Sequence, residues 1–265
     1  MTYKSIVNPE YESLTQFVNE VPHKFDREGV LIYDSRNQVR VFKLESGENI
    51  VVKRFHPPLF HQRFDYTFRR PSKAKRAYTY ALKLQELGIS TPDPIACIEG
   101  YHGGLYKQGY IVTTYCGDPD ARILREEWEQ HDDLFDALAH FLVDMHEKGF
   151  LHGDTNLSNF LYREDKESPT GYHITTIDIN RSKFVENPSR EECVKNLMRL
   201  THVRPALKKL IGKYAELRGW DAEWATTLAI QKLEAFERRR ELKHKMLSST
   251  TNISNMTNLY NAQCT

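Results

Sequence analysis

The first part of the chain alternates short hydrophobic runs, rich in β-branched residues, with polar segments. These runs are residues 29–33, 38–44, 49–55, 94–99 and 109–115. Residues 34–37 and 45–48, which separate the first three runs, contain Asp, Asn, Ser and Gly, which favour turns. Short apolar runs bounded by such turns are typical of β-strands joined by hairpins. The pattern therefore predicts an antiparallel sheet in this part of the chain.

Hydrophobic residues also recur at the spacing of an α-helix. Residues 72–87 form the first such segment, and Gly88 follows where the helix would end. After Gly117 a longer helical pattern covers residues 134–145 and is followed by Gly149, a residue that commonly ends helices. Further helices are predicted over residues 190–202, 205–217 and 222–246.

A sheet-rich part followed by a helical part predicts an α+β fold with two lobes. We expect a β-rich N-terminal lobe over residues 1–116, a helical lobe over residues 117–246 and a hinge near residues 115–119. The last nineteen residues, 247–265, contain no charged side chain and are rich in Ser, Thr and Asn. We expect them to form a disordered tail.

The composition adds little electrostatic bias. The chain has 265 residues, of which 37 are basic and 36 acidic, so the formal net charge is +1 and nothing favours a nucleic-acid partner. Four scattered cysteines form no C-x-x-C pair, which indicates a reducing compartment. The first twenty residues lack the apolar core of a signal peptide, and no run approaches the roughly 18 apolar residues of a membrane span. We expect a soluble, cytoplasmic protein, and attachment to a membrane surface stays open.

The most specific pattern is a polar loop. The sequence HGDTNLSN at residues 152–159 has the form H-x-D-x-x-x-x-N, and Asp178 ends a short hydrophobic strand downstream. Phosphoryl transfer needs a carboxylate that accepts the proton of the attacking hydroxyl and oxygen ligands that hold Mg²⁺ on the nucleotide phosphates. Lys53 ends a β-branched run far upstream, as does the phosphate-binding lysine of kinases. Singly, the loop could hold only capping residues and Lys53 could lie on an edge strand, but together with Asp178 they favour phosphoryl transfer.

Around these motifs the chain resembles the lipopolysaccharide core kinases, a bacterial family with a protein-kinase-like fold that phosphorylates Kdo or heptose of the inner core. The resemblance runs from about residue 17 to about residue 210. It is carried by stretches that are weak singly and specific together, namely residues 33–42, 51–53, 72–78, 87–94, 152–154 and 177–181. It implies a bilobal protein-kinase-like fold whose N-terminal lobe binds the nucleotide.

The resemblance also implies a role for each site residue. Asp154 would be the catalytic base, Asn159 and Asp178 the magnesium ligands, and Lys53 the lysine that contacts the α- and β-phosphates of ATP. With Mg²⁺ bound, the enzyme would transfer a phosphoryl group from ATP to a hydroxyl of Kdo or, as the second choice, of heptose. The acceptor would be the lipopolysaccharide core or Kdo-lipid A.

The chain departs from protein kinases in three places. Arg36 and Asn37 stand where a Gly-rich loop is expected, so backbone amides or the Arg36 guanidinium would contact phosphate there. Asp178 is followed by Ile-Asn rather than Phe-Gly, and no A-P-E segment follows, which favours a small or lipid-linked acceptor. The predicted helix 72–87 has no Glu in its middle to pair with Lys53. Either another acid supplies that pair, or phosphate alone holds Lys53, or the enzyme is weakened.

Two other functions stay open. The protein could be a kinase of another small molecule or of a protein, or a pseudokinase that binds nucleotide or lipid and regulates a partner. The missing Glu favours the pseudokinase. The intact set of Asp154, Asn159 and Asp178 opposes it.

Residues 53–76 contain eight basic and five aromatic residues and a single acid, Asp65. Mixtures of basic and aromatic residues bind anionic lipid surfaces, nucleic acids or anionic sugars. A solvated loop with buried aromatic side chains is the other interpretation. Because the acceptor would be an anionic glycolipid, we favour peripheral contact of this segment with the anionic inner membrane.

Overall fold

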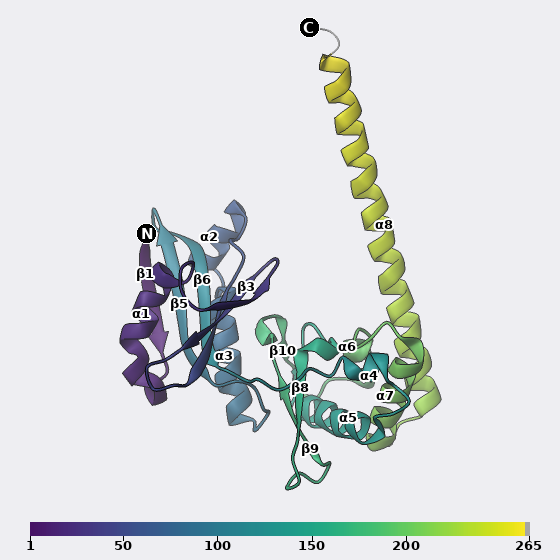
Figure 1. The fold of residues 1–265 in the computed structure, drawn as a ribbon. Coiled ribbons are helices and arrows are strands. Elements are labelled where there is room, and N and C mark those ends of the chain that lie inside the picture. The colour runs from purple at the N-terminus through teal and green to yellow at the C-terminus, as the bar shows by residue number, and fades with distance from the viewer. Residues whose placement is uncertain (263–265) are drawn as a thin grey trace.

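The computed structural model describes the backbone of residues 1–262 and the side chains of residues 1–243 and 245. The N-terminal part is built on a six-stranded antiparallel sheet with the strand order β1-β5-β6-β4-β3-β2 (Figure 1). The strands are β1 (Thr2–Val7), β2 (Val30–Asp34), β3 (Gln38–Lys43), β4 (Asn49–Arg54), β5 (Pro94–His102) and β6 (Leu105–Thr114). Strand β4 lies inside the sheet, between β3 and β6, so its backbone is paired on both sides.

Helices cover both faces of this sheet. Helix α1 (Thr15–Lys24) packs on one face, where Ile50 and Val52 of β4 are buried. Helix α3 (Lys73–Glu86) covers the other face, and α2 (Phe60–Phe68) lies against β6. Side chains alternate between the two faces of a strand, so a residue next to Val52 in β4 points toward the α3 side.

The C-terminal part is mainly helical and has its own core. The helices are α4 (Ile123–Glu126), α5 (Asp132–Glu147), α6 (Arg190–Leu197), α7 (Arg204–Leu217) and α8 (Ala222–Ala262). Helix α7 packs between α5 and α8. The apolar period predicted for α5 faces this core, because Leu138, Leu142 and Met145 are fully buried. Helix α8 projects away from the rest of the molecule (Figure 1).

Short elements between these helices form the loops that matter for function. Strand β7 (Phe150–Leu151) pairs with β10 (Lys183–Phe184), and β8 (Phe160–Glu164) pairs with β9 (Tyr172–Thr176). Two 3₁₀ turns, η2 (Leu157–Asn159) and η3 (Ile179–Arg181), come directly before β8 and shortly after β9. All of them lie between α5 and α6 in sequence.

Helix α3 joins the two parts of the molecule. Its residues Ala81 and Leu84, with Ile89 just beyond it, are buried in the same apolar cluster as α5 and α7. Nearer its start, Arg76 donates from Nε to the carbonyl of Asn180 in η3 at 3.2 Å. The helix therefore couples the sheet to the segment that follows β9.

The antiparallel N-terminal sheet and the helical C-terminal part confirm the predicted fold class. The elements that the sequence did not reveal include β1, α1 and α2 in the N-terminal part. Strand β1 is a mostly exposed edge strand, so it lacks a hydrophobic run, and α1 contains Pro22, which argues against a helix. Helix α2 buries only Tyr66 along its length, so its apolar side chains have no helical core pattern.

The predicted C-terminal helices also needed correction. Helix α6 ends at Leu197 rather than near residue 202, because the chain turns there and the Leu200 carbonyl accepts the amide of Leu157 at 3.1 Å. Helix α8 continues to Ala262 and so occupies most of the segment expected to be a disordered tail, 247–265. The sequence after residue 246 holds neither Gly nor Pro, so nothing in its composition stops a helix. Residues 263–265 lie outside the described residues.

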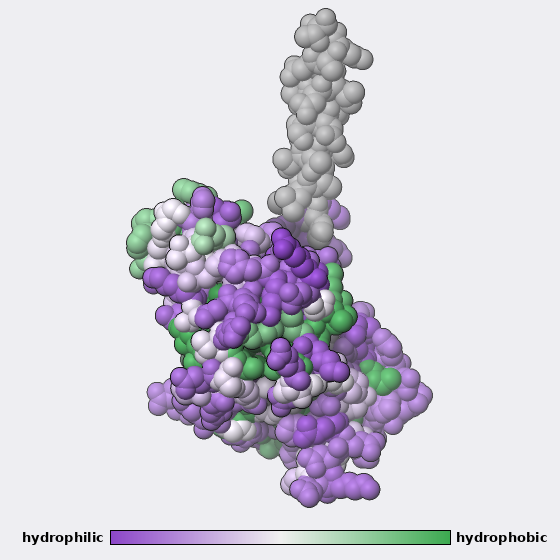
Figure 2. All heavy atoms as spheres, turned by 60° about the vertical axis from the view of Figure 1, so that its left-hand side comes forward, coloured by the Kyte–Doolittle hydropathy of each residue, from purple (hydrophilic) through white to green (hydrophobic). Residues whose placement is uncertain are grey.

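The surface is largely polar. Hydrophilic residues cover most of the face seen in Figure 2, with smaller hydrophobic groups between them. The exposed large hydrophobic side chains include those of residues 30–33 in β2 and several on and next to α2. Within the described residues, no helix has the length and apolar character needed to cross a membrane.

Candidate active site

Lys53 points from the sheet toward the helical part. In β4 it stands opposite Ile111 of β6, which packs with Phe55 and with α3. Its Nζ atom lies 2.6 Å from Oδ1 of Asp178, a residue 125 positions later in the chain. Asp178 is therefore the acidic partner of Lys53 that the sequence left undetermined.

The loop after β7 is fixed by His152, which is buried. Its Nε2–H donates to the Ile177 carbonyl at 2.9 Å, and its Nδ1 accepts the amide of Asp154 at 3.1 Å. Burial lowers the pKa of this imidazole, so it is neutral at pH 7. Gly153 has room for no side chain, because a Cβ there would lie 2.1 Å from the carbonyl oxygen of Arg181. Packing therefore sets the backbone that presents Asp154.

Asp154 holds its carboxylate between two arginines. Its Oδ1 lies 2.9 Å from Nη2 of Arg199, and its Oδ2 lies 3.7 Å from Nη1 of Arg181. Asn159 donates its side-chain amide to the Asp154 carbonyl at 2.8 Å, which closes the loop on itself. The Asp154 side chain remains 26% exposed, so a substrate hydroxyl could approach it from solvent.

The β8–β9 hairpin brings Asn159 and Asp178 to one end. Phe160 pairs with Thr176 at that end, and the Ile177 amide donates to the Asn159 carbonyl at 2.9 Å. Asp178 then adopts a left-handed backbone with φ 58° and ψ 44°, which turns the chain into η3. Such a conformation is uncommon outside glycine, and strained residues of this kind cluster at functional sites.

Asp178 is an ionised, partly buried carboxylate. Its Oδ1 accepts hydrogen bonds from Nζ of Lys53 and from Nδ2 of Asn180, both at 2.6 Å. Burial raises the pKa of Asp178, but the charge and the hydrogen bond of Lys53 outweigh burial and hold the pKa below its usual value. Its Oδ2 makes no hydrogen bond to any residue that the structure describes.

The oxygen atoms at this end of the hairpin fit a magnesium ion. Asp178 offers Oδ2, and Asn159 offers its side-chain oxygen because its nitrogen is already engaged by Asp154. Magnesium prefers oxygen ligands, takes only one or two carboxylates and keeps several waters or phosphate oxygens. Over the described part of the chain, no group of three or more His, Cys, Asp or Glu side chains could hold a metal alone. The donor set thus suits a nucleotide-bound ion rather than a closed protein cage.

Cations from α3 also face these carboxylates. The pKa of Lys73 is lowered by burial and by the positive charges of Arg36, Arg181 and Arg76, while Asp178 acts in the opposite direction. From the sequence, Lys73 and Arg76 belong to residues 53–76, the segment that we expected to contact the membrane. The structure instead places them beside the site, where a concentration of positive charge favours an anionic ligand.

Arg36 and Asn37 lie in the turn between β2 and β3. Arg36 is exposed and acts on the charge of Lys73, so this turn reaches toward the site. Asn37 accepts the amide of His56 with its side-chain oxygen at 3.0 Å, which ties the turn to the end of β4. A role of either residue in nucleotide binding stays a prediction.

Sequence reasoning missed Arg199. It follows α6 and reaches Asp154 only because Asn196 of that helix donates to the His152 carbonyl at 2.7 Å and so packs the helix end on the loop. No sequence motif marks such a contact. Arg181 belongs to the stretch 177–181 that carries the family resemblance, but no sequence signal marks its position near Asp154.

Comparison with known proteins identifies the family. The model of the lipopolysaccharide kinase (Kdo/WaaP) family matches residues 37–226, which is more than half of the chain. The chain belongs to the lipopolysaccharide kinase (Kdo/WaaP) family. The resemblance found in the sequence is therefore confirmed, and the matched region of this Kdo/WaaP family member contains Lys53, Asp154, Asn159 and Asp178.

Solved structures also resemble this Kdo/WaaP family member. WaaP in complex with acyl carrier protein matches with a TM-score of 0.59 and 16% identity, over 90% of this chain and 98% of the other. The Rio2 kinase–ADP/Mg²⁺–phosphoaspartate complex from Chaetomium thermophilum matches with a TM-score of 0.44 and 16% identity, over 90% of this chain and 78% of the other. The likeness to WaaP supports the fold assignment. No curated protein sequence matches the chain.

Proposed function

We propose that the protein transfers the γ-phosphoryl group of ATP to a sugar hydroxyl of the lipopolysaccharide inner core. Kdo is the preferred candidate for the acceptor sugar, and heptose is the second candidate. The observation that carries this proposal is the 2.6 Å contact between Lys53 and Asp178, which joins the sheet to the helical part beside Asp154 and Asn159. Membership of the lipopolysaccharide kinase family supports it.

Each residue has a separate task in this reaction. Asp154 accepts the proton of the sugar hydroxyl as that oxygen forms its bond to the γ-phosphorus and the bond to the β–γ bridging oxygen breaks, which releases ADP. Lys53 contacts the nucleotide phosphates. Asn159 and Asp178 hold Mg²⁺, which neutralises negative charge on the phosphates and helps to orient them.

The chain between Asp178 and α6 favours a small acceptor over a peptide. This stretch forms η3 and β10, and β10 is paired with β7, with Lys183 opposite Leu151. Helix α6 then starts at Arg190 with a capping box at Ser189. The segment is short and is already paired with β7, so it offers no long loop on which a peptide substrate could dock.

The test is transfer of labelled γ-phosphate from ATP to purified Kdo-lipid A, with a heptosylated acceptor and a generic protein in parallel. We expect label on the Kdo acceptor, less on the heptosylated one and none on the protein. A protein that binds ATP but labels neither glycolipid would favour the pseudokinase or a kinase with another substrate.

We further propose that the protein is cytoplasmic and touches the anionic inner membrane through α2. Phe60, Phe64 and Phe68 recur every fourth residue along this helix and are 74%, 53% and 65% exposed, and Leu59 beside them is 64% exposed. Residues 60–68 form a helix, whereas the alternative interpretation of the sequence was a solvated loop. Among the aromatic side chains of this helix, Tyr66 is buried and packs against Tyr106.

Positive charge flanks this aromatic stripe. The basic residues on and after α2 are Arg63, Arg69 and Arg70. Asp65, the only acid in the helix, lies 3.9 Å from Arg69 and 3.5 Å from Arg70, so its single charge offsets one of the three. Exposed aromatic rings beside basic side chains are typical of helices that lie in the interface of an anionic bilayer.

Sedimentation with vesicles that contain anionic lipid tests the contact. Replacing Arg63, Arg69 and Arg70 by Gln should reduce binding, with most of the loss at low salt, because exposed charges are screened at high salt. Gln at Arg238 and Arg239 of α8 is the matched control. If wild type and both variants bind the vesicles equally, α2 faces solvent and does not contact the membrane. If the protein binds purified acyl carrier protein but not the vesicles, the surface of α2 is a protein-binding surface.

A further inference from the structure

A cavity opens beside the loop that carries Asp154. It has a volume of about 160 Å³ and lies between α4, the loop before η2, the segment after α6 and the middle of α8. Its charged and polar lining comprises Arg122, Arg125, Asn156, Arg199, His202 and Arg240, together with Glu237. Three segments distant in sequence therefore contribute arginines to one small space.

The charge of this cavity is positive. Glu237, the acid in the lining, is engaged by Arg204, whose Nη2 lies 2.5 Å from Oε2 and which does not itself line the space. Arg125 lies 2.7 Å from Glu126, a carboxylate that is mostly exposed to solvent. Arg240 has no carboxylate within 4.0 Å among the residues that the structure describes. Arg122 and Arg199 are paired with Asp120 and Asp154, so an anion entering the space would find its freest guanidinium groups at Arg125 and Arg240.

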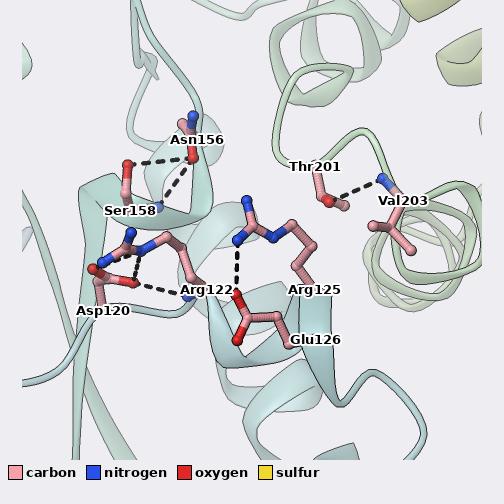
Figure 3. A network of polar contacts seen from close by, with 8 residues as sticks. All are labelled: Asp120, Arg122, Arg125, Glu126, Asn156, Ser158, Thr201 and Val203. Carbon is pink, nitrogen blue, oxygen red and sulfur yellow. Dashed lines mark hydrogen bonds and ion pairs between the residues drawn. The ribbon is translucent and has the colours of Figure 1, made fainter.

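The close-up of this region shows how the donors are arranged (Figure 3). Arg122 turns to Asp120, which accepts from its Nε at 2.8 Å and 3.0 Å, while Arg125 turns to Glu126. The Asn156 side-chain oxygen accepts the amide of Ser158 at 3.1 Å. The side-chain nitrogen of Asn156 is thus left as a donor.

Arg199 connects the cavity to the catalytic loop. Its guanidinium lies 2.9 Å from Oδ1 of Asp154 and stacks 4.8 Å from the ring centre of Phe236, a residue of the lining. One side chain therefore belongs both to the cavity wall and to the surroundings of Asp154. A group bound in the cavity is placed within one side chain's length of the proposed base.

We infer that this cavity binds an acidic group of the acceptor, a carboxylate or a phosphate, and thereby holds the sugar hydroxyl near Asp154. The inference rests on the proposed function. Kdo is a sugar acid, and the lipid part of the glycolipid can carry phosphate, so the same guanidinium chemistry recognises either group. The volume suits one such group rather than a whole glycolipid, so the rest of the acceptor lies outside.

The test compares a double variant of the cavity lining with a control variant on α8. Arg125→Gln with Arg240→Gln removes two lining cations that do not touch Asp154, and Arg239→Gln removes an exposed cation of α8 that does not line the cavity. Equilibrium binding of Kdo-lipid A in detergent micelles and the KM for this acceptor are measured on the full chain. We expect the double variant to bind about tenfold more weakly or worse, with a matching rise in KM, and Arg239→Gln to behave as wild type.

Modified acceptors identify the recognised group. Kdo-lipid A with esterified carboxylates and Kdo-lipid A without lipid phosphates are titrated against wild type and the double variant. The modification that removes the difference between the two proteins marks the group bound in the cavity. Far-ultraviolet circular dichroism of both variants should match wild type, since Arg240 is exposed and Arg125 is only partly buried.

The outcomes separate the cavity from the proposed function. The inference is overturned if the double variant binds Kdo-lipid A as wild type does, if Arg239→Gln weakens binding equally, or if neither modification of the acceptor matters. If wild type transfers no phosphate to the acceptor but the double variant still binds it more weakly, the proposed function fails and the cavity assignment stands.

Discussion

The sheet part and the helical part bring opposite charges to the same place. From the sheet side, Lys53 of β4 and Lys73 of α3 point at the site, and Arg36 lies near them. From the helical side come the carboxylates of Asp154 and Asp178. Cations suit the phosphates of a nucleotide, and carboxylates suit a metal ion and a proton, so in the proposed reaction the two parts would divide the chemistry between them.

The two parts also differ in how they hold these groups. Lys53 lies on a regular strand paired on both sides, and its long side chain can meet phosphate from several directions. Asp154 and Asp178 lie on irregular backbone, fixed by the buried His152, by the close approach at Gly153 and by the left-handed conformation of Asp178. The proposed base and metal ligand need tighter positioning than the proposed phosphate-binding cation does, and irregular backbone locked by packing would supply it.

Removing the proposed metal ligand, Asp178, should have the largest effect. We expect Asp178→Asn to lower turnover by about 10⁴-fold or more, because loss of the ion removes several kcal/mol of transition-state stabilisation. Phosphate transfer is measured across a range of Mg²⁺ concentrations, with Asp144→Asn, a surface carboxylate paired to Lys148, as the control. Unchanged turnover at low Mg²⁺ would remove Asp178 from the site.

The next largest effect is expected at the base. Asp154→Asn keeps the shape of the side chain but removes its basicity, so turnover should fall by about 10²–10⁴-fold while ATP binding changes little. Turnover with Kdo-lipid A and the Kd for ATP are measured together, and Asp165→Asn in the loop after β8 is the control. Wild-type turnover in Asp154→Asn would show that another group takes the proton.

On the sheet side a smaller change is expected. Lys53→Met keeps the packing of the stem but removes one charge-assisted contact to phosphate, which is typically worth about 1.5–3 kcal/mol, or about 10- to 100-fold in affinity. The KM for ATP reports this loss, and Lys43→Met on the neighbouring strand β3 is the matched control. If Lys53→Met binds and uses ATP as wild type does, the sheet does not supply the phosphate contact.

The smallest effect concerns stability. Burial lowers the pKa of His146 in α5 to about 4, and its ring contacts Tyr214 and Asn196. A base with a lowered pKa stabilises the fold above its unfolded pKa, and this contribution is lost as the pH falls from about 6.5 toward 4, by about 2 kcal/mol at pH 5. Urea unfolding at pH 7 and pH 5 should show this loss. His146→Gln should reduce the loss and leave the background from His152, and an unchanged loss would contradict the assignment to His146.

The sequence predicted most of this division because its signals are local. Asp154 and Asn159 share one short motif, and Asp178 ends a short hydrophobic strand. The sequence alone therefore predicted that these three residues belong to one site. Lys53 followed from its strand. The acidic partner of Lys53 could not be read, because Asp178 joins it only when the two parts meet.

The rest depends on packing between distant segments. Arg199 reaches Asp154 because α6 packs against the catalytic loop, and the four arginines of the cavity come from three separate segments of the chain. Strand β1 and helix α1 were missed because an exposed edge strand lacks a hydrophobic run and Pro22 argues against a helix. Periodicity detects elements with a long buried face, whereas β1 is mostly exposed and α1 buries only Val18 and Val21.

Nucleotide binding with and without Mg²⁺ tests the division between the two parts most directly. The Kd for ATP is measured by calorimetry in Mg²⁺ and in chelator, for wild type, Lys53→Met and Asp178→Asn. We expect Lys53→Met to weaken binding in both conditions and to keep the gain in affinity that Mg²⁺ gives wild type, whereas Asp178→Asn should lose most of that gain. If Asp178→Asn keeps the full magnesium-dependent gain, or if Lys53→Met alone abolishes it, the helical part does not hold the ion and the division between cations and carboxylates is wrong.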